Sequence, residues 1–423
     1  MNVTIKPNKL QGTVVIPPSK SLSHRAIIGA ALAQGKSTIS NVMFSKDILA
    51  TIDAVRAIGA TVNVFDDAIE VIGTGGVRRA TDLIDANESG STIRFMIPIA
   101  LVSKEPIKFI GKNNLVKRPL DIFFEIFDMQ GIDYKHEIGS YLPLEVKGGL
   151  KPGVFNIRGD ISSQFITGLL YALPLLDKDS KIIITTEMES KGYIDLTLDM
   201  LSNFGIEIIN NNYKEFIIKG NQKYLPFDYV IEGDYSQSAF FLVADMLGAD
   251  ITLKAMSKDS YQGDKKILSD IEEFGGNIEF VDDSLKATLN TQKNAIIDLG
   301  QSPDLGPALS VLAGLTKGNS KLINAERLRI KECDRITCVK EELNKLGMNV
   351  DETKTELIFN GVSRIKGGVV DAHNDHRVAM ALAMAALKSD GDIKILGAEC
   401  VSKSYPTFWD VYESLGGIIS YEE

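Results

Sequence analysis

Basic side chains stand at the beginnings of several predicted helices that are otherwise apolar. Lys20 and Arg25 lie at the start of the stretch SLSHRAIIGAALAQG, and Arg377 lies at the start of DHRVAMALAMAALKSDG. The N-terminus of a helix carries roughly half a positive charge, so a cation there is unfavourable unless an anion lies beside it. Helix N-termini also bind phosphate and carboxylate groups through their free amides. The pattern therefore predicts a site for anionic ligands.

Further polar residues occur in the loops that lead into a second set of predicted helices. They are Arg118 in LVKRPLDIF, Ser190 and Tyr193 in ESKGYIDL, Lys331 and Arg335 in RIKECDRI, and Lys403 in VSKSYPTFW. A single surface lysine or arginine is usually solvated, but these cations recur at equivalent points of a net acidic chain. If the fold brings those points together, we expect one cleft with enough positive charge for two polyanions.

Few side chains are candidates for moving a proton. The carboxylates are Asp304 in SPDLGP, with helix capping as the alternative, and Glu332, which lies among cations and has ion pairing as the alternative. His376 fits a core or capping role equally well. Cys333 and Cys338 have no catalytic context, and we interpret them as structural.

An internal repeat of about seventy residues is expected to position these side chains. Six amphipathic stretches end in a glycine that is followed by a strand-like segment, at Gly59, Gly131, Gly205, Gly275, Gly347 and Gly416. Glycine at that point is typical of a helix C-terminus. Six other stretches are apolar on nearly every face and begin at Ser21, Ser91, Ser162, Ser236, Asp304 and Asp375. Such helices are expected in the interior, and we interpret Ser236 and Ser238 as N-caps.

The repeat predicts an α/β protein with one inner and one outer helix in each of six units. We place a first domain at residues 18–230 and a second at residues 231–423, completed by residues 1–17. Many doubly wound α/β proteins also alternate helices and strands, which is the alternative fold.

Composition excludes several functional classes. With 46 basic and 56 acidic residues the net charge is −10, which argues against a nucleic-acid or acidic-membrane partner. Three cysteines without a CxxC pair fit a reducing cytosol, and the four histidines lack zinc-ligand spacing, so we expect no metal. The N-terminal residues lack the apolar core of a signal peptide, and the longest apolar run, residues 378–387, is ten residues long and too short for a membrane span. No G-x-x-x-x-G-K-[ST] loop is present, which disfavours nucleotides as phosphate donors.

A series of motifs resembles the enolpyruvyl transferases in order and along the whole chain. The motifs are PPSKSLSHR, ESGSTIRF, KRPLD, SSQF, SKGYIDLTL, SPDLGPAL, RLRIKECDRI, NDHRVAMALA and VSKSYPTFW. They match best the members that act on shikimate 3-phosphate. The resemblance implies a two-domain inside-out α/β barrel of six βαβαββ repeats, three per domain, with the helices inside.

The resemblance also implies the reaction. The carboxyvinyl group of phosphoenolpyruvate would pass to the 5-hydroxyl of shikimate 3-phosphate with release of phosphate, on the route to chorismate and the aromatic amino acids. No cofactor is implied, and we expect a cytoplasmic monomer whose partners are these two small molecules.

Site residues follow from the resemblance position by position. The shikimate 3-phosphate set is Lys20, Ser21, Arg25, Ser162, Ser163, Gln164, Ser190, Asp304 and Lys331. The phosphoenolpyruvate set is Lys20, Gly90, Arg118, Gln164, Arg335, Arg377 and Lys403. Asp304 would be the base, Glu332 the proton donor, and Lys20 would offset developing phosphate charge.

The chain departs from the family pattern at two places. Arg327 stands where several members carry Asn, and we leave it out of the shikimate site. Glu88 and Ser89 precede Gly90 where an amide is common at the first position, which leaves sensitivity to glyphosate, a competitor of phosphoenolpyruvate, open.

Two other functions are the alternatives. The sister enzyme that acts on UDP-N-acetylglucosamine typically has a mobile-loop cysteine ahead of the arginine matched by Arg118, and GKNNLVKRP has none. A non-catalytic anion-binding relative is disfavoured because Lys20, Asp304, Glu332 and Arg377 are all present.

Overall fold

The computed structural model describes residues 1–422 in two compact units. One unit is Lys20–Ile231, and the other combines Glu232–Glu423 with Met1–Ser19. We call them the 20–231 unit and the 232–423 unit, the latter including residues 1–19. The chain therefore passes from one unit to the other twice, between residues 19 and 20 and between residues 231 and 232.

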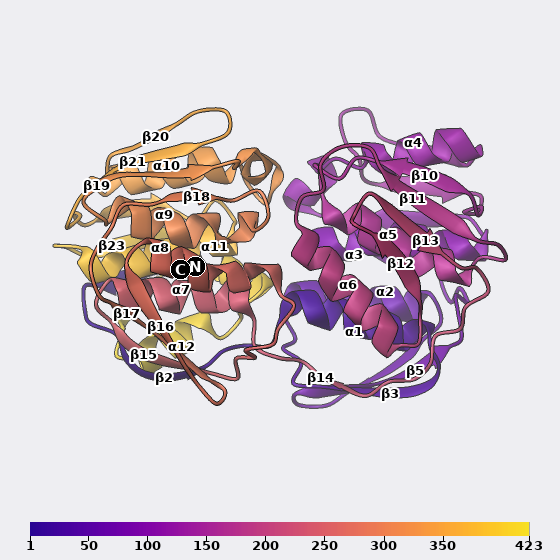
Figure 1. Cartoon of the computed structure of the whole chain (residues 1–423), viewed down its shortest axis with the longest axis horizontal. Coiled ribbons are helices and arrows are strands. Elements are labelled where there is room, and N and C mark those ends of the chain that lie inside the picture. Colours follow the sequence, from indigo (N-terminus) through magenta and orange to yellow (C-terminus); the bar gives the residue numbers. More distant parts are fainter. Residues whose placement is uncertain (423) are drawn as a thin grey trace. The chain divides into compact units, whose positions relative to one another are not determined.

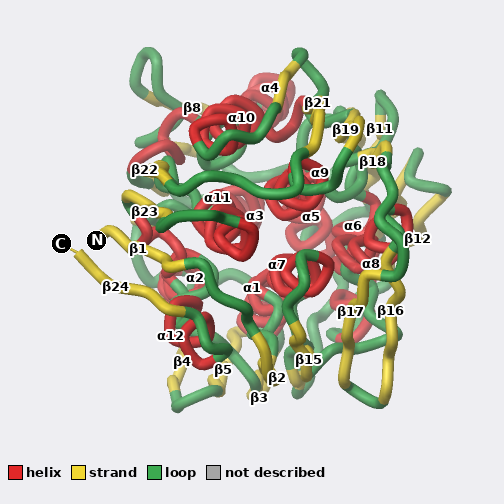
Figure 2. Tube along the Cα trace, turned by 90° about the vertical axis from the view of Figure 1, so that its left-hand side faces the viewer, coloured by secondary structure: helices red, strands yellow, loops and turns green. Residues whose placement is uncertain are grey.

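Six inner helices are buried over nearly their whole length. They are α1 (Lys20–Leu32), α3 (Gly90–Ala100) and α5 (Ser163–Ala172) in the 20–231 unit, and α7 (Tyr235–Met246), α9 (Gly306–Gly314) and α11 (His376–Ala385) in the 232–423 unit. Helices that are apolar all round need such an environment, because they have no polar face to present to water. Figure 2 shows α7, α9 and α11 in the interior of their unit, with strands toward the outside.

Six outer helices alternate with the inner ones along the chain (Figure 1). They are α2 (Lys46–Ala57), α4 (Asp121–Gln130), α6 (Lys191–Asn203), α8 (Ile267–Glu273), α10 (Arg335–Lys345) and α12 (Phe408–Ser414). The glycine predicted to end each of them has a positive φ, between 63° and 105°. Glycine adopts this left-handed conformation without the steric cost of a side chain, so these six predicted ends are confirmed.

Three four-stranded sheets belong to the 20–231 unit. Their strand orders are β14 (Tyr229–Val230), β3 (Gln34–Ser40), β5 (Ala68–Thr74), β4 (Thr61–Val64); β6 (Leu83–Asp85), β7 (Ile107–Ile110), β9 (Leu144–Lys147), β8 (Asp133–His136); and β10 (Val154–Ile157), β11 (Ser180–Ile184), β13 (Glu215–Ile218), β12 (Ile208–Asn211). In each sheet the first two strands are parallel and the remaining pairs are antiparallel.

The 232–423 unit repeats this arrangement in three further sheets. Their orders are β2 (Gln11–Val15), β15 (Asp250–Lys254), β17 (Ser284–Leu289), β16 (Gly276–Val281); β18 (Ile296–Asp298), β19 (Gly318–Ile323), β21 (Leu357–Gly361), β20 (Val350–Glu352); and β22 (Gly368–Asp371), β23 (Ile393–Leu396), β1 (Asn2–Lys6), β24 (Ile418–Glu422). The N-terminal strands β1 and β2 complete two of these sheets, as β14 completes one in the other unit.

Within residues 1–422, none of the helices combines the length and apolar character needed to cross a membrane.

Candidate functional site

Lys20 begins α1 and is held by an acidic side chain from the neighbouring outer helix. Its Nζ lies 2.8 Å from Oδ2 of Asp47, and both side chains are largely buried. Asp47 stands in the first turn of α2, where a carboxylate also interacts favourably with the positive end of that helix. The pair holds the ammonium group at the N-terminus of α1.

Arg25, one turn further along α1, is a buried cation. Its guanidinium donates to Thr197 Oγ1 (2.9 Å) and to the carbonyls of Ser21 (2.8 Å) and Tyr193 (3.0 Å), and it lies over the ring of Phe95. All of these partners are neutral, and within residues 1–422 Arg25 forms no ion pair. Burial lowers the pKa of Arg25 to about 10, and its side chain therefore still carries a positive charge at neutral pH. This environment is suited to an anion from outside the protein.

Gln164 connects the beginnings of α3 and α5. Its Oε1 accepts from Arg94 Nη1 at 2.8 Å, and its Nε2 donates to Ser91 Oγ at 3.0 Å. The Ser162 hydroxyl caps α5 by accepting from the backbone N–H of Gln164, and Ser163 is the first residue of that helix. These contacts bring the predicted SSQF residues next to the start of α3.

Gly90 and Arg118, both predicted for phosphoenolpyruvate, lie against each other. A β-carbon placed on Gly90 would come within 2.5 Å of Arg118 Nη1. Ser190 directly precedes α6, and this helix contacts Arg25. The carbonyl of Tyr193 in α6 accepts from Arg25 and also from the Thr197 hydroxyl, so Ser190 lies on the Arg25 side of the same unit. Ser190 itself is buried in a left-handed conformation directly before α6.

A second cluster, in the 232–423 unit, is centred on Arg335. Each nitrogen of its buried guanidinium donates to a carboxylate: Nε to Asp375 (2.7 Å), Nη1 to Asp304 (2.9 Å) and Nη2 to Glu332 (2.6 Å). These three carboxylates hold the pKa of Arg335 well above its usual value, although burial alone would lower it. The residue is therefore a fixed cation with a crowded set of acidic partners.

Asp304 lies between three cations. Oδ1 is 3.0 Å from Lys331 Nζ and also bonds Arg335, while Oδ2 is 3.3 Å from Arg377 Nη2. Burial would raise the pKa of Asp304, but the charges of Arg377, Lys331 and Arg335 outweigh it and keep the pKa well below its ordinary value. The residue lies in the short 3₁₀ turn Pro303–Leu305, directly before α9.

Lys331 and Lys403 complete the predicted set in this unit. Burial lowers the pKa of Lys331 to about 8, even though Asp304 acts in the opposite direction. Lys403 Nζ donates to the carbonyl of Asn374 at 2.7 Å, next to Asp375. The structure thus brings Asp304, Lys331, Glu332, Arg335 and Arg377 into one group, with Lys403 beside it.

Sequence reasoning missed the acidic partners of the cations. The sequence gives no indication of Asp47 as a partner of Lys20, and it indicates Asp375 only as a helix start, although this residue is fully buried against Arg335. Arg94 donates to Gln164, a contact that the sequence pattern does not indicate. The available signal was the position of Asp375 in the same helix-start motif as Arg377.

The predicted caps of α7 are wrong. Asp234 is the N-cap and accepts from the amides of Ser236 (2.8 Å) and Gln237 (3.3 Å). Ser236 instead donates to Asp264 at 2.6 Å, and Ser238 donates to the Tyr235 carbonyl within the helix. The carboxylate that precedes the helix is the stronger acceptor and takes the free amides.

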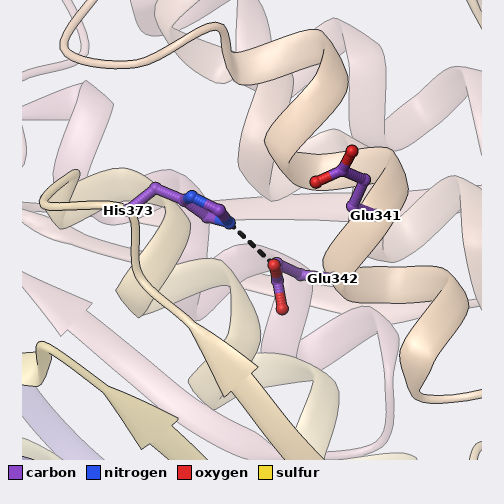
Figure 3. A group of neighbouring side chains, drawn as sticks. All are labelled: Glu341, Glu342 and His373. Atoms are coloured by element: carbon purple, nitrogen blue, oxygen red, sulfur yellow. Dashed lines mark hydrogen bonds and ion pairs between the residues drawn. The ribbon is translucent and has the colours of Figure 1, made fainter.

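Another group of titratable side chains lies around α10 (Figure 3). Glu341, Glu342 and His373 are close enough together to hold a metal ion. However, both oxygens of buried Glu342 accept from Lys345 at 2.8 Å, and Oε1 also binds His373 Nε2 at 2.7 Å. A metal ion would have to displace the ammonium group of Lys345. We therefore interpret the group as an ion-pair network.

Comparisons with known proteins connect these clusters to one family. The profile of EPSP synthase (3-phosphoshikimate 1-carboxyvinyltransferase) matches residues 4–412. The chain is 50% identical over 422 residues to the 3-phosphoshikimate 1-carboxyvinyltransferase of Clostridium perfringens, with 99% of each chain covered. It is 52% identical over 420 residues to that of Clostridium botulinum, with 98% of this chain and 97% of the relative covered. A solved EPSP synthase from Acinetobacter baumannii superposes with a TM-score of 0.80 at 25% identity, over 99% of this chain and 100% of that one. The likeness confirms the predicted fold class.

Proposed function

Because the chain belongs to the EPSP synthase family, we propose that its two clusters together bind shikimate 3-phosphate and phosphoenolpyruvate and transfer the carboxyvinyl group between them. The observation that carries the proposal is Arg25, a buried cation whose protein partners are all neutral. A charge in that environment is stabilised when a ligand phosphate supplies the missing anion. We propose further that the 20–231 and 232–423 units are the two domains of the enzyme.

Shikimate 3-phosphate takes its place mainly on the 20–231 unit. Its proposed contacts there are Lys20, Ser21, Arg25, Ser162, Ser163, Gln164 and Ser190, with Asp304 and Lys331 from the other unit. At the N-terminus of α5, the hydroxyls of Ser162 and Ser163 and the side-chain amide of Gln164 are neutral donors, whereas Arg25 provides a positive charge. Such a combination orients a phosphorylated polyol through both charge and hydrogen bonds.

Phosphoenolpyruvate uses cations of both units. Its proposed contacts are Lys20, Gly90, Arg118, Gln164, Arg335, Arg377 and Lys403. The carboxylates bonded to Arg335 leave it little capacity for a ligand. Arg118, Arg377 and Lys403 therefore carry more of the ligand's charge than Arg335 does.

In the reaction, the 5-hydroxyl loses a proton while the methylene carbon of phosphoenolpyruvate gains one. The resulting tetrahedral ketal then expels phosphate and loses a proton from its methyl carbon, which restores the carbon–carbon double bond of the carboxyvinyl group. Asp304 is ionised at neutral pH and accepts the hydroxyl proton, although its depressed pKa makes it a weak base in the free enzyme. Ligand anions that draw Lys331 and Arg377 away from Asp304 remove the charges that depress its pKa, and so strengthen the base.

Glu332 is the proposed proton donor to the methylene carbon. Its Oε2 accepts from Arg335 at 2.6 Å, so the carboxyl must first take up a proton to act in this way. Lys20 compensates the charge that develops on the departing phosphate, which is a large catalytic contribution in such reactions. The enzyme works as a cytoplasmic monomer without metal or cofactor.

Phosphate release tests this function directly. We expect release only when shikimate 3-phosphate and phosphoenolpyruvate are both present, with no loss of turnover in the presence of a chelator. UDP-N-acetylglucosamine in place of shikimate 3-phosphate is expected to give none. Turnover with the nucleotide sugar would assign the chain to the sister activity, and no turnover with either acceptor would leave only anion binding.

A further inference from the structure

A chain of hydrogen bonds runs through the interior of the 20–231 unit from α1 to the start of α3. His24 Nδ1 lies 2.7 Å from Thr51 Oγ1, and Thr51 Oγ1 lies 2.7 Å from Thr92 Oγ1. The Thr92 hydroxyl donates to Ser89 Oγ at 2.7 Å. All four residues are completely buried. Ser89 is the N-cap of α3 and immediately precedes Gly90.

The chain has one direction. The single hydroxyl proton of Thr92 goes to Ser89, so Thr51 must donate to Thr92 and His24 must donate to Thr51 through an Nδ1 proton. Burial, reinforced by the charges of Lys20 and Arg25, keeps the pKa of His24 well below its usual value, so the ring is neutral and carries one proton. Within residues 1–422 Nε2 has no hydrogen-bond partner, which agrees with an unprotonated nitrogen there, because a buried donor without an acceptor is the costlier alternative.

The same pair of helices positions Lys20. Lys20 and His24 are one turn apart on α1, and their partners Asp47 and Thr51 are one turn apart on α2. The two bonds are therefore successive connections between the same faces of α1 and α2. The first holds the Lys20 ammonium group, and the second continues through Thr92 to Ser89.

From this arrangement we propose that Thr51 and Thr92 are positioning residues, which hold the Ser89–Gly90 backbone in register with Lys20 and against Arg118. They touch no ligand themselves. The inference deepens the proposed function, on which it rests, since Lys20, Gly90 and Arg118 all belong to the proposed phosphoenolpyruvate set. Loss of one hydroxyl in the chain lets the start of α3 shift, and affinity for phosphoenolpyruvate falls while shikimate 3-phosphate is bound as before.

The test compares Thr51→Val, which keeps the shape and removes the hydroxyl, with Thr51→Ser, which keeps the hydroxyl. We expect Thr51→Val to raise the KM for phosphoenolpyruvate roughly tenfold, as for a lost buried hydrogen bond, with the KM for shikimate 3-phosphate within about twofold of wild type. Thr51→Ser is expected to restore the wild-type value. Thr92→Val provides an independent variant on a different helix and is expected to give the same split.

Thr316→Val is the matched control. Thr316 is buried in the 232–423 unit, where its hydroxyl donates to the Leu312 carbonyl at 2.8 Å. It is expected to lower the thermal unfolding temperature without changing either KM. Unchanged KM values in folded Thr51→Val and Thr92→Val, or equal rises for both substrates, would overturn the inference while leaving the proposed function intact. Absence of phosphate release by the wild-type enzyme would instead overturn the proposed function.

Discussion

The guanidinium of Arg118 fills the space that a side chain on residue 90 would occupy. A β-carbon on Gly90 would lie 2.5 Å from Arg118 Nη1 and 2.9 Å from its Cζ. Contacts this short cannot be accommodated without movement of one partner. A side chain at residue 90 would therefore displace the arginine from its position.

Gly90→Ala should displace Arg118. We expect the KM for phosphoenolpyruvate to rise about tenfold or more, because a charged contact with the ligand carboxylate or phosphate is weakened, and the KM for shikimate 3-phosphate to change little. Gly368→Ala in β22 is the control, since the nearest atom to its added β-carbon is 3.4 Å away. Steady-state kinetics with each substrate varied in turn measures the effect, and an unchanged KM for phosphoenolpyruvate would contradict it.

Asp304→Ala and Glu332→Ala should each lower kcat by about 100-fold or more, the usual effect of removing a general acid or base. Both side chains are partly exposed, at 20% and 21%, and lie outside the apolar core, so the fold is expected to persist. Asp351→Ala, at an exposed carboxylate 77% accessible, serves as control. Near-normal turnover in both variants would show that the proton transfers use other groups.

Loss of the Lys331 proton should weaken the capture of shikimate 3-phosphate at high pH. Its pKa is lowered to about 8, so the ammonium form that binds phosphate is lost as the pH rises through that value. We expect kcat/KM for shikimate 3-phosphate to fall above about pH 8. In Lys331→Arg the side chain stays charged and the fall should move to higher pH. If wild type and Lys331→Arg show the same pH dependence of kcat/KM, the fall at high pH is caused by another group.

His373 should make stability depend on pH. Its hydrogen bonds with Cys338 and Glu342 raise its pKa to about 10 from an ordinary 6.5. Between these values the folded chain holds a proton that the unfolded chain has lost. The stabilisation is therefore complete below about pH 6.5 and is lost as the pH rises toward 10. His373→Gln removes this dependence. Urea unfolding at several pH values should show that wild type has a higher free energy of unfolding than the variant, by an amount that shrinks as the pH rises.

Ligand binding should bring the two units together. The proposed shikimate 3-phosphate set needs Asp304 and Lys331 from the 232–423 unit as well as Arg25 from the other. A bound phosphate dianion gives cations of both units a shared partner, so the compact state binds ligand preferentially. Small-angle scattering should show a smaller radius of gyration with shikimate 3-phosphate, and smaller still with phosphoenolpyruvate or glyphosate. An unchanged radius at saturating ligand would refute this.

The repeat and the cation positions could be predicted from sequence because their signals are local. Each glycine that ends an outer helix must adopt a positive φ, and each inner helix is apolar throughout. The acidic partners could not be predicted in this way. Asp47 lies 27 residues from Lys20 and Asp375 lies 40 residues from Arg335, and nothing near either cation indicates which carboxylate it meets.

Strand β14, which completes a sheet of the 20–231 unit, could not be predicted from the sequence either. Strand β14 has two residues, and its pairing with β3 joins positions 190 residues apart. A strand so short carries no periodicity of its own. Its place is decided by the open edge that the rest of the sheet offers it.

The position of β1 between β23 and β24 has a consequence for synthesis on the ribosome. Residues 20–231 hold all the strands and helices of their own unit, so this part can fold as soon as it has emerged. Strand β1 has no such opportunity, because its partners β23 and β24 are made only after the whole 20–231 unit. It must wait, unpaired and open to proteases or chaperones, until these two strands have emerged.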